Sequence, residues 1–164
     1  MVGVSLRAYE PADAECVNQL VWTAWCELAD SMPQCNELAP RLVALTEQAH
    51  QSEVIVAEFD GQIVGAVGYV AAHQPKPAFF DPAWAIVRML SVIPSARALG
   101  VGEQLLHACI DRAARDQAPL LALHTASVMR RASNRYARLG FEEIKDLPPL
   151  YGVPYLMLAK KIRH

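Results

Sequence analysis

Apolar and polar positions follow two different periods along the chain, and each change of period marks the start of another element. Residues 3–9 alternate with a period of two, which is typical of an edge strand. Over 11–29 the apolar positions recur at helical spacing, which predicts an amphipathic helix. The same spacing of Leu42, Leu45 and Ala49 predicts a second helical stretch.

Short apolar runs then predict a hairpin and a further strand. The runs 54–58 and 63–70 are rich in β-branched residues, and an Asp-Gly pair at 60–61 joins them. This pair predicts a tight hairpin, because type I′ turns need positive φ at both central residues. A loop with three prolines, 73–82, leads to the next strand, 84–92.

Helices and strands alternate in the second half of the chain. The predicted elements are a helix over 102–115, a strand over 120–124, a helix over 129–139 and strands over 141–145 and 155–160. Because a helix connects strands 84–92 and 120–124, we expect these two strands to be parallel. We therefore predict an α/β fold (α+β by some conventions), with a mixed, mostly antiparallel sheet, one central parallel strand pair and flanking helices, as a single domain over 1–164.

Composition excludes several classes of protein. The chain is 53% hydrophobic and 20% charged, which excludes a disordered chain. Its 15 basic and 17 acidic residues give a net charge of −2 with no basic block, so we predict no nucleic-acid partner. No apolar run reaches the roughly 18 residues of a membrane helix, and the first residues lack the layout of a signal peptide, so we predict no membrane partner.

The cysteines predict packing rather than chemistry. They are Cys16, Cys26, Cys35 and Cys109, and they form no CxxC pair and have no histidines at metal-ligand spacing, so no metal site is predicted. Cys16 and Cys109 fall on apolar helix faces, which is expected of buried, reduced thiols. Reduced cysteines in turn predict a cytoplasmic location.

A short turn with two glycines joins strand 84–92 to helix 102–115, and it contains Arg97, Gly100 and Gly102. The first turn of a helix has unpaired N–H groups and a partial positive charge, so it can bind an anion. The turn lacks the Lys-Ser/Thr end of a Walker A loop and the full spacing of a dinucleotide site. On the residues alone, close packing of helix and strand explains the glycines equally well.

Three motifs stand in this half of the chain. Their residues are Arg88-Met89-Leu90-Ser91-Val92, then Val92-x-Pro94-x-x-Arg97-x-x-Gly100-Val101-Gly102, and then Ala132-x-x-x-Tyr136-x-x-x-Gly140-Phe141. They resemble the R-x-L-x-V strand, the motif A turn and the A-x-x-x-Y-x-x-x-G-F signature of the GNAT superfamily of N-acetyltransferases. The motifs stand in the family's order and spacing, and the predicted elements match its topology over 3–161.

The resemblance implies a site for acetyl-CoA as co-substrate, without a metal. Motif A implies that the pyrophosphate is bound by the side chain of Arg97 and by main-chain N–H groups of Ala98, Leu99, Gly100, Val101 and Gly102. The pantetheine arm would lie between the separated strands 84–92 and 120–124, where it would bond to the main chain at Leu90, Ser91 and Val92.

The resemblance also implies that an amine attacks the thioester directly in a ternary complex. Such a reaction needs a neutral amine, a stabilised oxyanion and a proton for the departing thiolate. In the family's pattern Tyr136 supplies that proton as general acid, and a main-chain N–H near Leu90 stabilises the oxyanion. Without the motif, Tyr136 is better explained as an aromatic packing residue of its helix.

Three positions depart from the family's pattern. Ala98 stands where a glycine often follows the arginine, and Met129 stands where many members carry an asparagine. Ile86 replaces a glutamate that acts as base through water in many members. His124 and Glu27 are alternative bases, each also explained by an ordinary surface or packing role, and an amine of low pKa needs no protein base. The base therefore stays open.

The resemblance places the acceptor between the first helices, the region of strand 84–92 and the last hairpin. Aromatic residues that could line such a pocket are Trp22, Trp25, Trp84, Tyr151 and Tyr155. The same residues also suit a homodimer contact or a satellite core. We predict that the acceptor is a primary amine of a small molecule, with a protein or peptide amine as the second choice.

Two other interpretations stay open. The loss of a carboxylate at Ile86 and of an asparagine at Met129 also suits a non-catalytic acyl-CoA-binding domain, a sensor or interaction domain of the same fold. A globular interaction module with an accidental motif is the third interpretation. Binding of CoA separates the third interpretation from the others, and turnover separates an enzyme from a binding domain.

Overall fold

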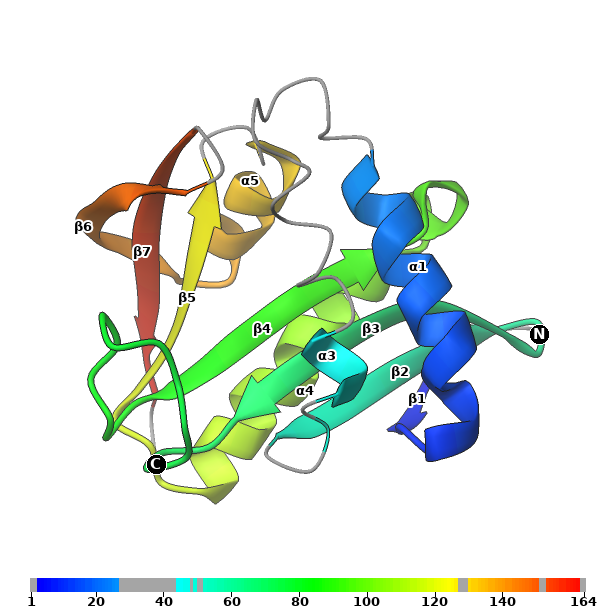
Figure 1. Ribbon diagram of the computed structural model, residues 1–164, viewed down its shortest axis with the longest axis horizontal. Coiled ribbons are helices and arrows are strands. Elements are labelled where there is room, and N and C mark those ends of the chain that lie inside the picture. Colours follow the sequence, from blue (N-terminus) through cyan, green and yellow to red (C-terminus); the bar gives the residue numbers. More distant parts are fainter. Residues whose placement is uncertain are drawn as a thin grey trace.

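One mixed sheet of seven strands organises the described part of the chain in the computed structural model (Figure 1). The structure describes residues 3–26, 44–47, 49, 52–126, 130–150 and 153–162. The strands are β1 (Ser5–Ala8), β2 (Glu53–Phe59), β3 (Gln62–Val70), β4 (Ala85–Val92), β5 (Leu120–Ala126), β6 (Glu142–Leu150) and β7 (Val153–Lys161). Their order is β1-β2-β3-β4-β5-β7-β6, and only β4 and β5 pair in parallel, so the predicted fold class is confirmed.

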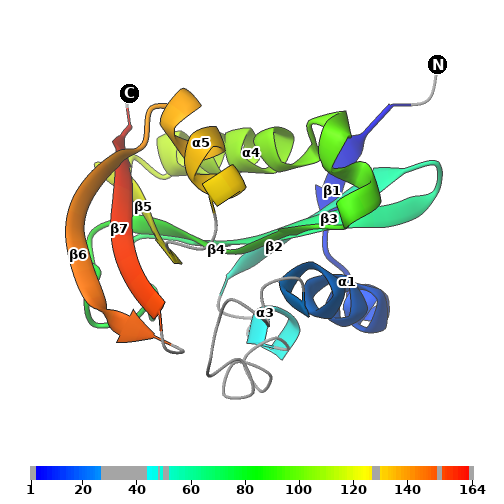
Figure 2. The same ribbon diagram turned by 90° about the horizontal axis from the view of Figure 1, so that it is seen from above.

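Helices cover both faces of the sheet, as Figure 2 shows from above. The helices are α1 (Ala14–Cys26), which follows a 3-10 turn over Pro11–Asp13, α3 (Ala44–Glu47), α4 (Val101–Arg115) and α5 (Arg130–Arg138). α4 and α5 lie on one face, and α1 and α3 lie on the other. Two buried apolar clusters result, one beneath α4 and one beneath α1.

Glycines on β3 let both helical layers approach the sheet closely. A Cβ on Gly65 would lie 2.7 Å from Cγ1 of Val101, the first residue of α4. A Cβ on Gly68 would lie 2.7 Å from Cδ1 of Leu45 in α3. Because packed interiors leave few gaps, a larger residue at either position would push a helix away. The start of α4 is thus fixed against the middle of the sheet.

Several sequence predictions are confirmed at the level of single residues. Asp60 and Gly61 have φ of 53° and 76°, as a type I′ hairpin between β2 and β3 requires. Gly140, which follows α5, has φ of 93°, which suits the left-handed end of a helix. β1 lies at one edge of the sheet, as the alternation of 3–9 predicts.

Other predictions need correction. The strand predicted over 141–145 continues as β6 to Leu150 through two prolines; because β6 is an edge strand, proline can take positions there that need no ladder N–H. Cys16 is exposed on α1, so its prediction as a buried thiol is wrong: the apolar stripe of α1 runs through Val17 instead. Cys109 is buried as predicted. Cys35 and the side chain of Cys26 lie outside the described part.

A buried carboxylate fixes the start of the first helical layer to the sheet. Asp13 accepts hydrogen bonds from Nη1 and Nη2 of Arg7 at 2.8 and 2.9 Å and from the Glu10 N–H at 2.8 Å. Arg7 lies on β1 and also pairs with Glu58 on β2. The hydrogen bonds from Arg7 are the main cause that lowers the pKa of Asp13.

Candidate functional site

The two parallel strands at the centre of the sheet pair only at their beginnings. Ala85 pairs with Leu121 and Ile86 with Ala122, and within the described residues no later pair joins β4 to β5. Both strands continue past this point, and their arrows diverge in Figure 1. Beyond Ile86, β4 and β5 therefore do not satisfy each other's main-chain groups, and an extended ligand can pair with them instead.

A β-bulge in β4 lies where the strands separate. The register against β3 shifts between Ala66 and Gly68, so Met89 and Leu90 together face one residue of β3. Met89 has φ of 52°, in the left-handed region that a large side chain rarely adopts. The hydroxyl of Ser91 donates to the Met89 carbonyl at 3.0 Å. The bulge, a feature that bends the strand carrying it, thus lies just past the last pair of β4 with β5.

A glycine turn connects β4 to α4. A 3-10 helix over Pro94–Leu99 ends at Gly100, which has φ of 74° and precedes the first residue of α4. The first α-helical bond there runs from the Gln104 N–H to the Gly100 carbonyl at 3.1 Å. The N–H groups of 101–103 precede this bond and have no partner within the helix. Together with the helix dipole, they favour an anion at this turn.

The residues predicted to bind the anion lie together at this turn. Ala98 and Gly100 are exposed, and so is the side chain of Leu99, at 41%. Arg97 is half-buried on the preceding 3-10 helix. Gly102 is buried as the second residue of α4. Gly100, which has no side chain, thus exposes its main chain, whereas Val101 and Gly102 at the start of α4 are buried.

Tyr136 lies on the α4 side of the sheet. It belongs to the apolar cluster beneath α4, is 7% exposed, and its ring contacts that of Phe141 edge-on at 5.8 Å between centroids. Burial raises the pKa of Tyr136 to about 12, while the positive charge of Arg135 opposes this rise. Tyr136 is therefore a protonated hydroxyl throughout the neutral range, as a proton donor must be.

His124 lies on the opposite, α1 side of the sheet. It follows Ala122 by two positions on β5, beyond the last parallel pair with β4. Its ring contacts three aromatic rings, those of Phe79 at 5.4 Å, Phe80 at 5.9 Å and Tyr155 at 5.6 Å between centroids. The surroundings of His124 are thus aromatic and half-buried, neither open solvent nor a helix surface.

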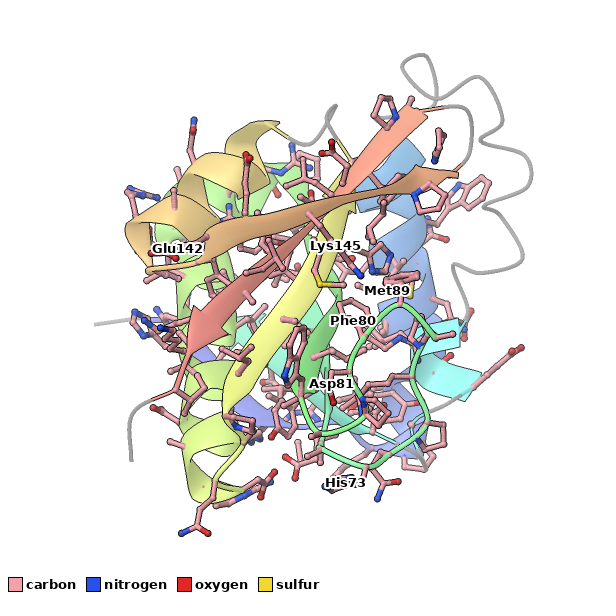
Figure 3. The ribbon with its side chains drawn as sticks, turned by 90° about the vertical axis from the view of Figure 1, so that its left-hand side faces the viewer. His73, Phe80, Asp81, Met89, Glu142 and Lys145 are labelled. Atoms are coloured by element: carbon pink, nitrogen blue, oxygen red, sulfur yellow. The ribbon has the colours of Figure 1, made fainter. Side chains whose placement is uncertain are left out.

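The loop between β3 and β4, residues 71–84, carries Phe80, labelled in Figure 3, and forms part of these surroundings through the ring contacts of Phe79 and Phe80 with His124. The ammonium group of Lys76 donates to the carbonyls of Ala71 at 3.2 Å, Gln74 at 2.8 Å and Pro82 at 3.3 Å, and so ties the loop to itself. The loop carries Phe79 and Phe80, which the sequence analysis left out. Two adjacent aromatics in a proline-rich loop were the available signal.

The predicted acceptor residues are only partly described. Trp22 is 47% exposed on α1, and Trp84 packs partly buried against the cluster beneath α1. Tyr155 belongs to that cluster and contacts His124. The predictions that fall on Glu27, Met129, Tyr151 and the side chain of Trp25 lie outside the described residues. A pocket lined by these aromatics thus stays a prediction.

Ile86, which stands where a carboxylate base was expected from the family's pattern, is buried among apolar residues. It is 1% exposed and belongs to the cluster beneath α1, the same side of the sheet as His124. Among the described side chains, no group of three or more His, Cys, Asp or Glu residues is placed to hold a metal ion. None of the described helices has the length and apolar composition needed to cross a membrane.

Comparisons with known proteins agree on one family. A sequence model described as the acetyltransferase (GNAT) family matches residues 20–141. A relative from Xenopus tropicalis, named "Probable N-acetyltransferase camello", is 35% identical over 97 residues. That match covers 58% of this chain and 42% of the relative, so the chain spans less than half of the relative's length.

Solved structures share the fold over almost the whole chain. An acetyltransferase of the GNAT family from Staphylococcus aureus Mu50 has a TM-score of 0.77 at 18% identity, with 98% of this chain and 100% of that chain covered. The protein yncA from Salmonella typhimurium, solved with its cofactor acetyl-CoA, has a TM-score of 0.75 at 17% identity, with 99% and 95% covered. At these identities the likeness concerns the fold.

Proposed function

The chain belongs to the acetyltransferase (GNAT) family, and on that premise we propose that it is an enzyme that transfers the acetyl group of acetyl-CoA to a primary amine of a small molecule. The observation that carries the proposal is the separation of β4 and β5 after Ile86, next to the glycine turn that begins α4. A phosphate-bearing, extended thioester fits this pair of features.

The chain's own groups suit the two ends of acetyl-CoA. Main-chain N–H groups at 98–102 and the side chain of Arg97 would bind the pyrophosphate. Leu90, Ser91 and Val92 would pair with the pantetheine amides, because this part of β4 is not paired with β5. The bulge at Met89 and Leu90 supports this assignment, since it interrupts the regular strand just past the last pair of β4 with β5.

The acid and the base would act from opposite sides of the sheet. The amine attacks the thioester carbonyl, a C–N bond forms, and the C–S bond of the resulting tetrahedral intermediate breaks. The main-chain N–H near Leu90 would stabilise the oxyanion. Tyr136, on the α4 side, would give its proton to the thiolate and regain one from the amine nitrogen through solvent.

His124 is our candidate for the group that removes the proton from the amine. It lies on the α1 side, the side of the apolar Ile86, and beyond the point where β4 and β5 separate. A neutral imidazole has one ring nitrogen that can accept a proton, as a general base must. An amine that is neutral in solution would need no such base. The pH dependence of His124→Asn distinguishes a reaction with this base from one without it.

The acceptor would lie on the α1 side of the sheet. The loop 71–84, Trp84 and the rings around His124 offer apolar surface there, which suits a small molecule with an apolar part better than a flexible protein tail. A protein or peptide amine is the second candidate.

A panel of primary amines with acetyl-CoA tests the proposal. We expect release of free CoA thiol that depends on one class of small amine and gives the acetylated amine in equal amount by mass spectrometry. Binding of CoA without turnover on any amine would favour the acyl-CoA-binding alternative. The absence of any rise in Tm at millimolar CoA would contradict both, because a ligand of the folded state raises Tm.

A further inference from the structure

An arginine from α5 lies directly over the first turn of α4. A Cβ built on Gly102 would lie 2.5 Å from Cζ and Nη1 of Arg135 and 2.9 Å from its Nε. Gly102 is the second residue of α4 and follows the glycine turn at Gly100. The absence of a side chain at Gly102 therefore makes the space that the guanidinium occupies, and the sequence analysis did not single out Arg135.

Arg135 lies in the last turn of α5, whose C-terminal end favours a cation, and also beside the first turn of α4, whose N-terminal end does not. The N-terminal end of a helix carries a partial positive charge, so a cation beside it is repelled. Among the described residues, no carboxylate forms an ion pair with Arg135, whereas Arg138 on the same helix pairs with Glu103 of α4 at 2.6 Å. The guanidinium of Arg135 thus lies beside main-chain N–H groups that already favour an anion.

We propose that Arg135 binds a phosphate group of the acyl-CoA, together with the main-chain N–H groups at the start of α4. The inference rests on the proposed function, because it assumes that the phosphates lie at this turn. A phosphate between the guanidinium and the start of α4 would attract both, since the guanidinium and the main-chain N–H groups would each donate hydrogen bonds to it. Arg135 would therefore be a cofactor-binding residue from α5, added to those of the turn.

The diphosphate is the nearer of the two phosphate sources in CoA. Arg135 lies over the first turn of α4, where the main-chain N–H groups are, and those groups are the proposed partners of the diphosphate. The 3′-phosphate of the ribose is the other source with the same chemistry. Derivatives of CoA that lack one or both groups separate these sources.

Arg135→Gln tests the proposal, because it removes the charged guanidinium that covers Gly102 and keeps a polar side chain. We expect the Kd for CoA, measured by calorimetry, to rise by about 10- to 100-fold, the effect of one hydrogen bond to a charged group. Arg135→Lys, which keeps the charge, should lose less. Arg138→Gln is the matched control on the same helix, and it should change the Kd by less than about threefold, as expected of an exposed ion pair.

Three ligands then identify the group that is bound. If Arg135→Gln loses the same factor in affinity for CoA and for dephospho-CoA, Arg135 binds the diphosphate. If it loses affinity for CoA alone, Arg135 binds the 3′-phosphate. With acetylpantetheine, which has no diphosphate, wild type and Arg135→Gln should have the same kcat/KM. An equal loss with acetylpantetheine would overturn the proposal in favour of a structural role, and so would an unchanged Kd for CoA. If the wild type itself does not bind CoA, the proposed function fails instead.

Discussion

Ile86 and Ala122 form the last residue pair of the parallel ladder between β4 and β5. Past this pair β4 carries the bulge at Met89 and Leu90, so the strand is irregular where it no longer pairs with β5. The pair also lies on the α1 side of the sheet, two residues before His124. The point where the sheet opens is therefore apolar on β4, and the nearest titratable group of β5 on that side is the imidazole.

Tyr136→Phe should separate catalysis from binding. The phenyl ring keeps the contact with Phe141 and the buried position, but it has no proton to give. We expect kcat to fall by about 10²- to 10⁴-fold, the usual contribution of a general acid, while the Kd for acetyl-CoA stays the same. Steady-state thiol release and calorimetry measure the two quantities.

The pH dependence gives a second measurement on the same residue. Because burial raises the pKa of Tyr136 to about 12, the protonated form is present at every pH below that value. Between pH 8 and 10 we therefore expect no loss of kcat in the wild type that is caused by ionisation of Tyr136. The kcat profiles of the wild type and of Tyr136→Phe should have the same shape over this range. A kcat that is unchanged by the substitution would remove Tyr136 from the mechanism and leave it as a packing residue.

His124→Asn should remove the acidic limb of the pH profile if the imidazole takes the proton of the amine. In the wild type we expect kcat/KM for the amine to fall at acidic pH, because a charged imidazole cannot accept the proton of the amine. The variant should be slower at pH 8 and should lose this limb. If the acidic limb persists in His124→Asn, it belongs to the ionisation of the amine itself, and His124 is not the base.

The sequence predicted the succession of helices and strands along the chain and the parallel pair, because those follow from local patterns and from the helix that connects two strands. It did not predict that β7 lies between β5 and β6. It also predicted the φ values at Asp60 and Gly61, since few residues adopt that turn. It did not predict that β6 continues to Leu150. Proline normally ends a strand, and only the edge position, a property of the whole sheet, makes it tolerable.

In the candidate site too, some residues could be predicted from the sequence and others could not. The turn at Gly100 and the tyrosine at position 136 follow from short motifs, whose spacing is visible in the sequence. The contacts of His124 with Phe79 and of Arg135 with Gly102 join residues far apart in the chain. No periodicity reports such contacts, because they depend on how α5 and the loop 71–84 pack on the sheet.

Gly100→Ala should weaken both folding and the binding of CoA. Gly100 has φ of 74° and a Cβ there would meet no atom within 4 Å, so the cost is backbone strain of about 1–2 kcal/mol. Any relaxation of this strain moves the turn, and we expect a several-fold higher Kd for CoA. Gly61→Ala is a matched control, with φ of 76° and the same open space. It should lose similar stability in urea unfolding and keep its Kd.

Asp13→Asn should destabilise the protein in a pH-dependent way. The folded state lowers the pKa of Asp13 below its ordinary 3.8, chiefly through the hydrogen bonds from Arg7. Its contribution is therefore present above pH 3.8 and is lost as the pH falls through the lowered pKa of the folded state. At pH 7 we expect a loss of about 1–3 kcal/mol in the free energy of unfolding, and a smaller loss at pH 3. Asp111→Asn, at an exposed carboxylate of α4, should change little at either pH.

Lys76→Met should impair the acceptor while it spares the binding of CoA. The ammonium group donates hydrogen bonds to three carbonyls of the loop 71–84 and so joins its two ends. Without them the loop that carries Phe79 and Phe80 loses its fixed position beside His124. We expect the KM for the amine to rise several-fold while the Kd for CoA and kcat change little. Lys161→Met makes the same change at an exposed position of β7 and should leave all three constants as they are. An unchanged amine KM in Lys76→Met would place the acceptor away from this loop.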